Sequence, residues 1–399
     1  IAMINLAVRE VTHTWFRYLL TAFGLGLLIG VTMTMAGVVR GMIDDATAVI
    51  SAAQADIWVV QDDTLGPYAE VSVLYDDVAR TIAGLPGVAE TSNVIYFTLQ
   101  ARHNENDMRV MVAGFEPGRA GEPPQLAVGR PITQSRYEAI ADVKTGFKLG
   151  DQIKIRRNHY TVVGLTQGMV SSGGDPVVFL SLRDAQEVQF QKDNTSIYND
   201  RDRLAANPQL NRPGAPGVLQ AVTDMQTTNN KVNAVLVRVT PGYDANSVAE
   251  NIRRWKHLGA FTLAEQQEIL QAKVVYTAVR QVGLFLVILT IVSIAIVALI
   301  IYTMTMGKIK EIAVLKLIGA RNSTIAAMIL QEALGLGLIG FVLGKITSTF
   351  WAPLFPKTIV FMVADSIAAF FFTMLVCVIA SLIGIRAALK VQPAAAMGG

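Results

Sequence analysis

The sequence predicts an α-helical membrane protein with four transmembrane helices and a large α+β extracytoplasmic domain of two subdomains. Three observations lead to this prediction. The 399 residues are 52% hydrophobic and 16% charged, whereas about a quarter of the residues in a typical soluble domain are charged. The apolar residues gather in four runs, each close to the roughly 20 residues that a helix needs to cross a bilayer. The segment between the first and second runs has the mixed polarity of a globular domain.

Four membrane spans are expected, at residues 18–40, 279–306, 323–350 and 366–386. The first run is too long for the apolar part of a signal peptide and no A-x-A pattern follows it, so we expect a retained span. Glu332 lies about nine residues into the third span, or about 14 Å along a helix. A carboxylate at that depth is a candidate intramembrane polar site, although it could instead bond to a neighbouring helix or lie near the interface. Lys345, near the outer end, can reach the headgroups.

Lysine and arginine in the short flanking segments indicate the orientation. They precede the first span, occupy the loop between the second and third spans, and follow the fourth span: Arg9, Arg17, Lys308, Lys310, Lys316, Arg321, Arg386 and Lys390. Cytoplasmic loops are enriched in these residues, so we expect both termini to be cytoplasmic. An amphipathic N-terminal helix at 1–17, a loop helix at 307–322 and a tail at 387–399 then lie inside. A domain at 41–275 and a short loop at 351–365 lie outside.

The outer domain is expected to contain a split α/β subdomain and an inserted β-rich subdomain. Residues 41–115 and 231–275 form the first, with strands at 56–60, 94–99 and 234–239 and helices at 76–85 and 245–256. Residues 116–230 form the second, with a hairpin over 153–165 and a strand at 177–180. Residues 189–230 are rich in Asn, Gln, Asp and Pro, which predicts a long mobile loop that is either disordered or ordered by a partner protein.

Several classes of function are disfavoured. A net charge of +3 leaves no electrostatic basis for nucleic-acid binding. The four histidines are far apart and show no metal-ligand spacing, and the single cysteine, Cys377, lies in an apolar run. We find no nucleophile–base arrangement, so we expect neither a catalytic site nor a cofactor or metal site in this chain.

The loop between the second and third spans is the most informative segment. Residues 308–321 read Lys-Ile-Lys-Glu-Ile-Ala-Val-Leu-Lys-Leu-Ile-Gly-Ala-Arg. As a helix this segment places Ile309, Ile312, Ala313 and Lys316 on one side, and Gly319 is a natural stop. Such a helix could pass force from a soluble protein into the membrane, or it could be a basic interfacial helix that anchors the loop.

This loop resembles the signature loop of ABC transporter permeases of the MacB, LolC and DevC type. The N-terminal segment, residues 55–60, residues 160–165 with 179–186, and residues 386–396 are also similar to parts of that family, so the resemblance covers most of the chain and is closest to DevC-like members. In the family this loop is the coupling helix that docks on the ATPase. The resemblance therefore implies an ATPase-coupling role for nine residues: Lys308, Lys310, Glu311, Ile312, Leu315, Lys316, Gly319, Ala320 and Arg321.

The resemblance also implies partners and a mechanism. The sequence has no Gly-x-x-x-x-Gly-Lys-Ser/Thr motif, so ATP and magnesium are expected on a separate ABC ATPase subunit. We expect a bacterial inner-membrane permease that transmits ATP-driven motion to its periplasmic domain. It would export a lipid-like or amphiphilic substrate with a periplasmic adaptor and an outer-membrane duct. The alternatives are a four-span signalling complex that activates cell-wall hydrolases and a lipoprotein-releasing permease.

Four spans are too few to enclose a large pathway, so a homodimer, or a heterodimer with a paralogue, is expected. Two small-residue motifs, Gly26-x-x-x-Gly30 and Gly340-x-x-x-Gly344, would let helices approach closely. The sequence leaves open whether they pack between subunits or within one.

Overall fold

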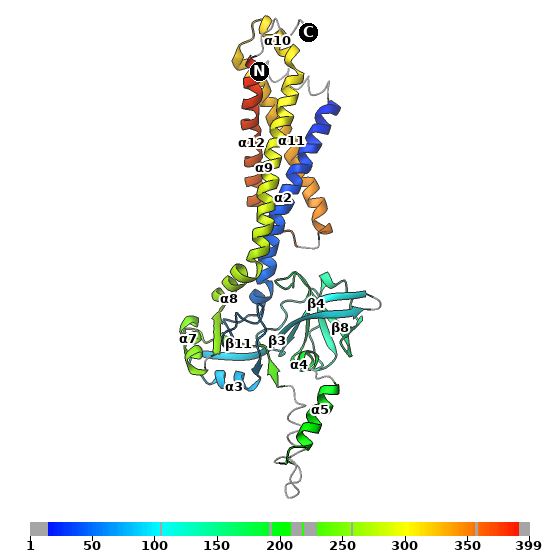
Figure 1. Cartoon of the computed structure of the whole chain (residues 1–399), viewed down its shortest axis with the longest axis vertical. Coiled ribbons are helices and arrows are strands. Elements are labelled where there is room, and N and C mark those ends of the chain that lie inside the picture. Colours follow the sequence, from blue (N-terminus) through cyan, green and yellow to red (C-terminus); the bar gives the residue numbers. More distant parts are fainter. Residues whose placement is uncertain are drawn as a thin grey trace. The chain divides into compact units, whose positions relative to one another are not determined.

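A computed structural model describes residues 15–103, 106–190, 194–208, 218, 230–256, 258–355 and 358–390 (Figure 1). The predicted helix at 1–17 and the predicted tail at 387–399 fall largely outside these residues. The chain divides into two compact units, residues 1–42 with 278–399, and residues 43–277. Each unit is described by itself.

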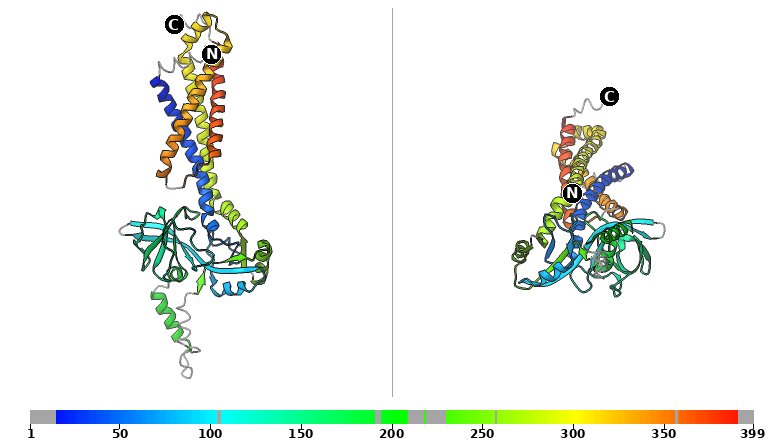
Figure 2. Two further views of the ribbon diagram at one scale, coloured as in Figure 1. Left: turned by 180° about the vertical axis from the view of Figure 1, so that it is seen from behind. Right: turned by 60° about the horizontal axis from the view of Figure 1, so that its bottom comes forward.

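The first unit is a helical bundle. Its long helices are α2 (Trp15–Ala52), α9 (Tyr276–Gly307), α11 (Asn322–Trp351) and α12 (Val363–Lys390), and the last residues of α2 belong to the second unit. Between them lie α10 (Ile309–Leu317) and the short η3 (Ala352–Leu354). Among the described residues, four helical segments are long and apolar enough to cross a membrane. They run side by side in the views of Figures 1 and 2.

The bundle has an apolar core to which all four long helices contribute. Its buried members are Tyr18, Ala22, Leu25, Ile29, Met33, Val297, Ile301, Ala333, Leu336, Val376, Cys377 and Ala380. Helix α9 contributes least, because its apolar segment is 11% buried whereas those of the other three helices are 33% to 44% buried. Most of its apolar surface therefore faces outward, as expected of a helix that borders lipid.

The second unit is built on one large mixed sheet. Its strands are β1 (Ile57–Gln61), β3 (Val88–His103), β4 (Asn106–Phe115), β5 (Val128–Gly129), β6 (Glu138–Asp142), β7 (Gln152–Ile155), β8 (Asn158–Thr166), β9 (Val177–Ser181), β11 (Ala234–Val239) and β12 (Leu258–Thr262). The order is β12-β1-β11-β3-β4-β9-β6-β8-β5, and β7 pairs with β3 and β8. Strands β2 (Leu74–Tyr75) and β10 (Lys231–Val232) form a second, two-stranded sheet.

The long β3–β4 hairpin carries the sheet from one half of the domain to the other (Figure 2). On one edge β3 pairs with β11, and on the other β4 pairs in parallel with β9. The expected subdomain boundary near residue 116 therefore falls between strands of one continuous sheet. The sequence pattern could not show this, because strand pairing between distant segments leaves no local signal.

Both faces of the sheet are buried at β1. Ile57 and Val59 belong to one apolar cluster, and Trp58 and Val60 belong to another on the opposite face. A strand that is covered on both faces reads as a continuous apolar run instead of an alternating one, which is why residues 56–60 stand out in the sequence. The first cluster includes residues of helices α3 (Asp77–Ala83) and α7 (Ala245–Lys256), and the second includes the end of α2.

The remaining elements connect this sheet. They are η1 (Val143–Thr145), α4 (Leu182–Phe190), α5 (Asn194–Ala205), α8 (Leu263–Ile269) and the π-helical segment η2 (Leu270–Val275). The expectation of a loop throughout residues 189–230 is wrong at α5. This helix is polar, so apolar spacing does not reveal it, but Asn194 is a residue type that favours a helix start and Arg, Leu and Ala favour its interior. Most of the rest of that stretch lies outside the described residues.

Candidate functional site

Helix α10 is a short helix with a defined start and stop. It follows Lys308, and its last turn closes on Gly319, which has a φ of +91°. The Gly319 N–H donates to the Lys316 carbonyl at 3.1 Å, and the Ala320 N–H donates to the Leu315 carbonyl at 3.0 Å. This pair of bonds is the Schellman arrangement, which needs a left-handed residue and therefore favours glycine. The Ile-Gly-Ala ending of the loop is thus explained by helix termination.

One face of α10 is buried against two long helices. Ile312 and Ala313 are each 1% exposed. Ile312 belongs to an apolar cluster with Ile325 and Ile329 of α11 and Ala388 of α12. The face that amphipathic spacing predicts is the face that packs.

Two lysines fasten α10 to the same helices. The Lys308 ammonium lies 2.7 Å from a carboxylate oxygen of Glu332 in α11, and the two side chains are 19% and 15% exposed. The Lys316 ammonium donates to the carbonyl oxygens of Ala388 and Leu389, at 3.3 and 2.9 Å. A cation at the last carbonyls of α12 satisfies acceptors that the helix end leaves open and interacts favourably with the helix dipole.

Glu332 therefore has a nearby cation as its partner. This bond joins Glu332 to the residue that precedes α10, and the depth of Glu332 in the membrane stays a prediction. The Tyr18 hydroxyl also donates to the Glu332 carbonyl oxygen at 3.1 Å, which links α2 to the same turn of α11. Lys345 donates to Ser366 Oγ at 2.8 Å and lies over the Phe361 ring, so its ammonium has partners within the chain.

The opposite face of α10 is exposed; it carries Lys310 and Glu311 near its start and three apolar residues toward its end. Val314, Leu317 and Ile318 are 45%, 57% and 78% exposed. They stand at i, i+3 and i+4, so they form a stripe on one side of the helix. Sequence reasoning that followed the buried face did not name them, although the same spacing rule identifies them. We call these three residues the exposed stripe of α10.

The nine predicted coupling residues divide into four groups. Lys308, Ile312 and Lys316 bond or pack within the bundle, and Gly319 and Ala320 close the helix. Leu315 is half-buried, and three residues are exposed: Lys310, Glu311 and Arg321.

The two glycine motifs meet each other within one chain. A Cβ added at Gly26 would lie 3.1 Å from the Gly340 carbonyl oxygen, and one added at Gly344 would lie 2.9 Å from the Gly26 carbonyl oxygen. A Cβ added at Gly30 would lie 3.0 Å from the Gly344 carbonyl oxygen. Helices α2 and α11 are thus in backbone contact, and the motifs serve packing inside the bundle.

Within the described part of the chain, no group of three or more His, Cys, Asp or Glu side chains could hold a metal ion. Among the described residues, the bundle is held by packing, by helix caps and by ion pairs, of which Lys308–Glu332 is partly buried.

Comparisons with known proteins agree with this architecture. Residues 18–255 match the MacB-like periplasmic core domain, and residues 283–393 match the FtsX-like permease C-terminal domain. The first match alone covers more than half of the chain, so the chain belongs to the ABC transporter permeases with a MacB-like periplasmic core and an FtsX-like permease domain.

Relatives align over the whole chain. The Mycobacterium tuberculosis H37Rv proteins named uncharacterized ABC transporter permease Rv0072 and Rv2563 are 23% and 22% identical, each aligned over 100% of both chains. The crystal structure of the periplasmic region of MacB from Actinobacillus actinomycetemcomitans is 9% identical, with a TM-score of 0.35, over 55% of this chain and 94% of that one.

The chain is accordingly a multi-pass membrane protein with a periplasmic domain. A permease of this class has no catalytic activity of its own and works with an ATPase.

Proposed function

We propose that this chain is the permease subunit of an ABC transporter in which α10 is the docking point of a separate ATPase. The observation that carries the proposal is the division of α10 into two faces. One face is fastened to α11 and α12 by Ile312, Lys308 and Lys316. The other presents the exposed stripe, which offers a partner an apolar surface of the kind that forms the core of protein interfaces.

A displacement of α10 would be transmitted to the bundle as a whole. Its ion pair and its cluster bind it to α11, and the Lys316 bonds bind it to the end of α12. The Tyr18 bond and the glycine contacts join α2 to α11. Helix α2 continues as one helix to Ala52, and its last turns contribute to the core of the periplasmic domain. Packed elements of this kind move as units, so ATP-driven motion at α10 can reach that domain.

The remaining parts of the proposal concern topology and partners. Both termini lie in the cytoplasm of a bacterial cell, as the basic segments indicate, and the permease acts as a homodimer in the inner membrane. It exports a lipid-like or amphiphilic substrate together with a periplasmic adaptor and an outer-membrane duct. The ATPase subunit holds the ATP and magnesium.

Purification in mild detergent from native membranes tests the proposal. We compare the unchanged chain with Leu317→Glu, which places a charge in the exposed stripe. The matched control is Val128→Glu, an equally exposed apolar residue (54%) of the outer domain. We expect mass spectrometry to find an ABC ATPase with the unchanged chain and the control, and to find it strongly depleted with Leu317→Glu. Equal recovery with both variants would show that α10 is not the docking point.

The co-purified proteins also separate the transport function from its rivals. A periplasmic adaptor supports export through a duct. A cell-wall hydrolase in its place would instead identify a signalling complex, and the absence of any ATPase from the unchanged chain would refute the transporter proposal.

A further inference from the structure

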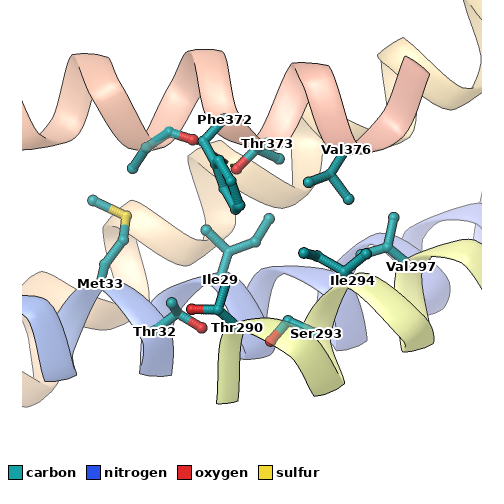
Figure 3. Close-up of a pocket in the computed structure, with 11 residues that line it drawn as sticks. Ile29, Thr32, Met33, Thr290, Ser293, Ile294, Val297, Phe372, Thr373 and Val376 are labelled. Carbon is teal, nitrogen blue, oxygen red and sulfur yellow. Dashed lines mark hydrogen bonds between the residues drawn. The ribbon is translucent and has the colours of Figure 1, made fainter. Parts of the chain in front are cut away.

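A recess lies between three helices of the bundle. It has a volume of about 70 Å³ and is bounded by α2, α9 and α12. Figure 3 shows residues of all three helices around it, among them Met33, Ile29, Phe372 and Val297. Two of the residues that line it, Phe372 and Ile294, are 47% and 37% exposed. The recess therefore opens on the outer surface of the bundle.

Its hydroxyl groups offer no free proton to a ligand. Four lining residues carry a hydroxyl, and each donates to the carbonyl oxygen four residues earlier in its own helix, at 2.7 to 2.9 Å: Thr32, Thr290, Ser293 and Thr373. Such back-bonding satisfies the side chain inside its helix. The wall that remains consists of aliphatic, thioether and phenyl groups, so the recess suits an apolar ligand.

The recess lies deep in the expected membrane. Ser293 stands 14 residues after residue 279 and 13 before residue 306, the two ends of its expected span. Thr32 stands 14 residues after residue 18, or about 20 Å along its helix. Ser293 is therefore near the middle of the hydrocarbon core, and Thr32, eight residues before residue 40, lies in its outer half. At both depths water is absent and the surrounding molecules are lipid chains.

Small side chains create the hollow, because Ser293, Thr290 and Ala369 stand where larger residues would fill the space between the helices. An unfilled space of this kind deprives its walls of dispersion contacts. A flexible hydrocarbon chain entering from the open side restores those contacts and needs no hydrogen bond.

We propose that the recess is a binding site for one acyl chain of a bilayer phospholipid, held between α2, α9 and α12. This site goes beyond the transport function and does not depend on it. The acyl chain fills the gap on the side of α9 that faces the bundle. It therefore adds to the contact between α9, the least buried span, and the other helices.

Photolabelling tests this site. The full chain is reconstituted in phosphatidylcholine nanodiscs that contain some phosphatidylcholine with a diazirine in the middle of one acyl chain. After irradiation, labelled peptides are located by mass spectrometry. We expect residues 290–297 and 369–376 to be labelled several-fold more than residues 338–342 of α11, which lie at a similar depth and whose Leu338 and Val342 are 48% and 49% exposed.

Two variants make the test specific. Ser293→Phe fills the recess and is expected to reduce labelling of 369–376 several-fold. Leu299→Phe places the same side chain at an exposed position (60%) of the same helix and is expected to leave it unchanged. Labelling of the two variants is compared only if both match the unchanged chain in thermal stability and in the yield of monodisperse protein. Equal labelling of the recess residues and of residues 338–342, or no loss in Ser293→Phe, would overturn the site.

A disulfide cross-linking test asks whether a second copy of the protein, instead of a lipid, occupies the recess. In a Ser293→Cys chain whose native cysteine is replaced by Ala, we expect no disulfide-linked dimer under mild oxidation in the nanodiscs. A dimer formed through residue 293 would assign the recess to a neighbouring copy and overturn the lipid proposal.

Discussion

Removal of the Lys308 ammonium is the sharpest test of how α10 is held. The pair that it forms with Glu332 has a distance of 2.7 Å, and both side chains are less than one-fifth exposed. A hydrogen bond to a charged group contributes about 1.5–3 kcal/mol, and breaking a fully buried pair costs about 3–5 kcal/mol. Because water reaches part of this pair, we expect Lys308→Met to lower the free energy of unfolding by about 2 kcal/mol, a factor of up to about 30 in the unfolding equilibrium.

A double-mutant cycle measures the interaction itself. Lys308→Met, Glu332→Leu and the double variant are unfolded by denaturing detergent titrated into mild detergent, with helicity as the readout. The double variant should be closer to the unchanged protein than the two single losses predict, because apolar replacement of both partners removes the unpaired charge. Lys310→Met, at an exposed position of the same helix, serves as the control. The reasoning would be refuted if each single variant lost no more unfolding free energy than Lys310→Met, or if the loss in the double variant equalled the sum of the two single losses.

Three further predictions concern other contacts. Gly344→Leu should lower the unfolding free energy by about 1–3 kcal/mol, because an added Cβ lies 2.9 Å from a carbonyl of α2; Val342→Leu, at an exposed position, should change it little in the same titration. The hydrogen bonds from Arg130 hold the pKa of Glu138 at about 2. Since the unfolded pKa is about 4.3, this stabilisation is present above that pH and is lost as the pH falls toward 2. In urea unfolding, the free energy of unfolding should fall less between pH 7 and pH 3 in Glu138→Gln than in the unchanged chain. The same pH dependence in both would contradict this role of Glu138. Asp142→Ala should cost about 3 kcal/mol in urea unfolding at pH 7, since the buried carboxylate accepts two backbone N–H groups that would lose their partner; a loss under about 1 kcal/mol would contradict this reasoning.

The membrane spans could be predicted because the bilayer imposes a length and a composition on each helix. The strand at 56–60 could be predicted because burial on both faces leaves a continuous apolar run. Helix α5 could not, since a polar helix lacks the apolar period on which the prediction depends. The continuity of the sheet across residue 116 could not be predicted, because β4 pairs with β9, which lies more than 60 residues further along the chain; the division into two subdomains stays a prediction.

At α10 the sequence indicated both the buried side and the stop. Ile312 and Ala313 follow the helical period, and Gly319 is required where the chain adopts a left-handed conformation. The exposed stripe follows the same helical period, so the same spacing rule could have identified it. The pairing of Glu332 with Lys308 could not be predicted from the sequence. The two residues are 24 positions apart, and several other cations in the loop were equally plausible partners for Glu332.

From the sequence alone one can predict the four long apolar helices, the segment that connects the second and third of them, and the residue at which that connecting helix ends. These properties depend on neighbours within a few residues or on the bilayer, so local pattern is enough to read them. The tertiary structure alone decided that Gly26 meets Gly344 inside one chain, that Glu332 is paired, and that small side chains on three helices enclose a recess. Each of these depends on the relative rotation of distant helices, which is set by the packing of the whole bundle and by no short stretch of the chain.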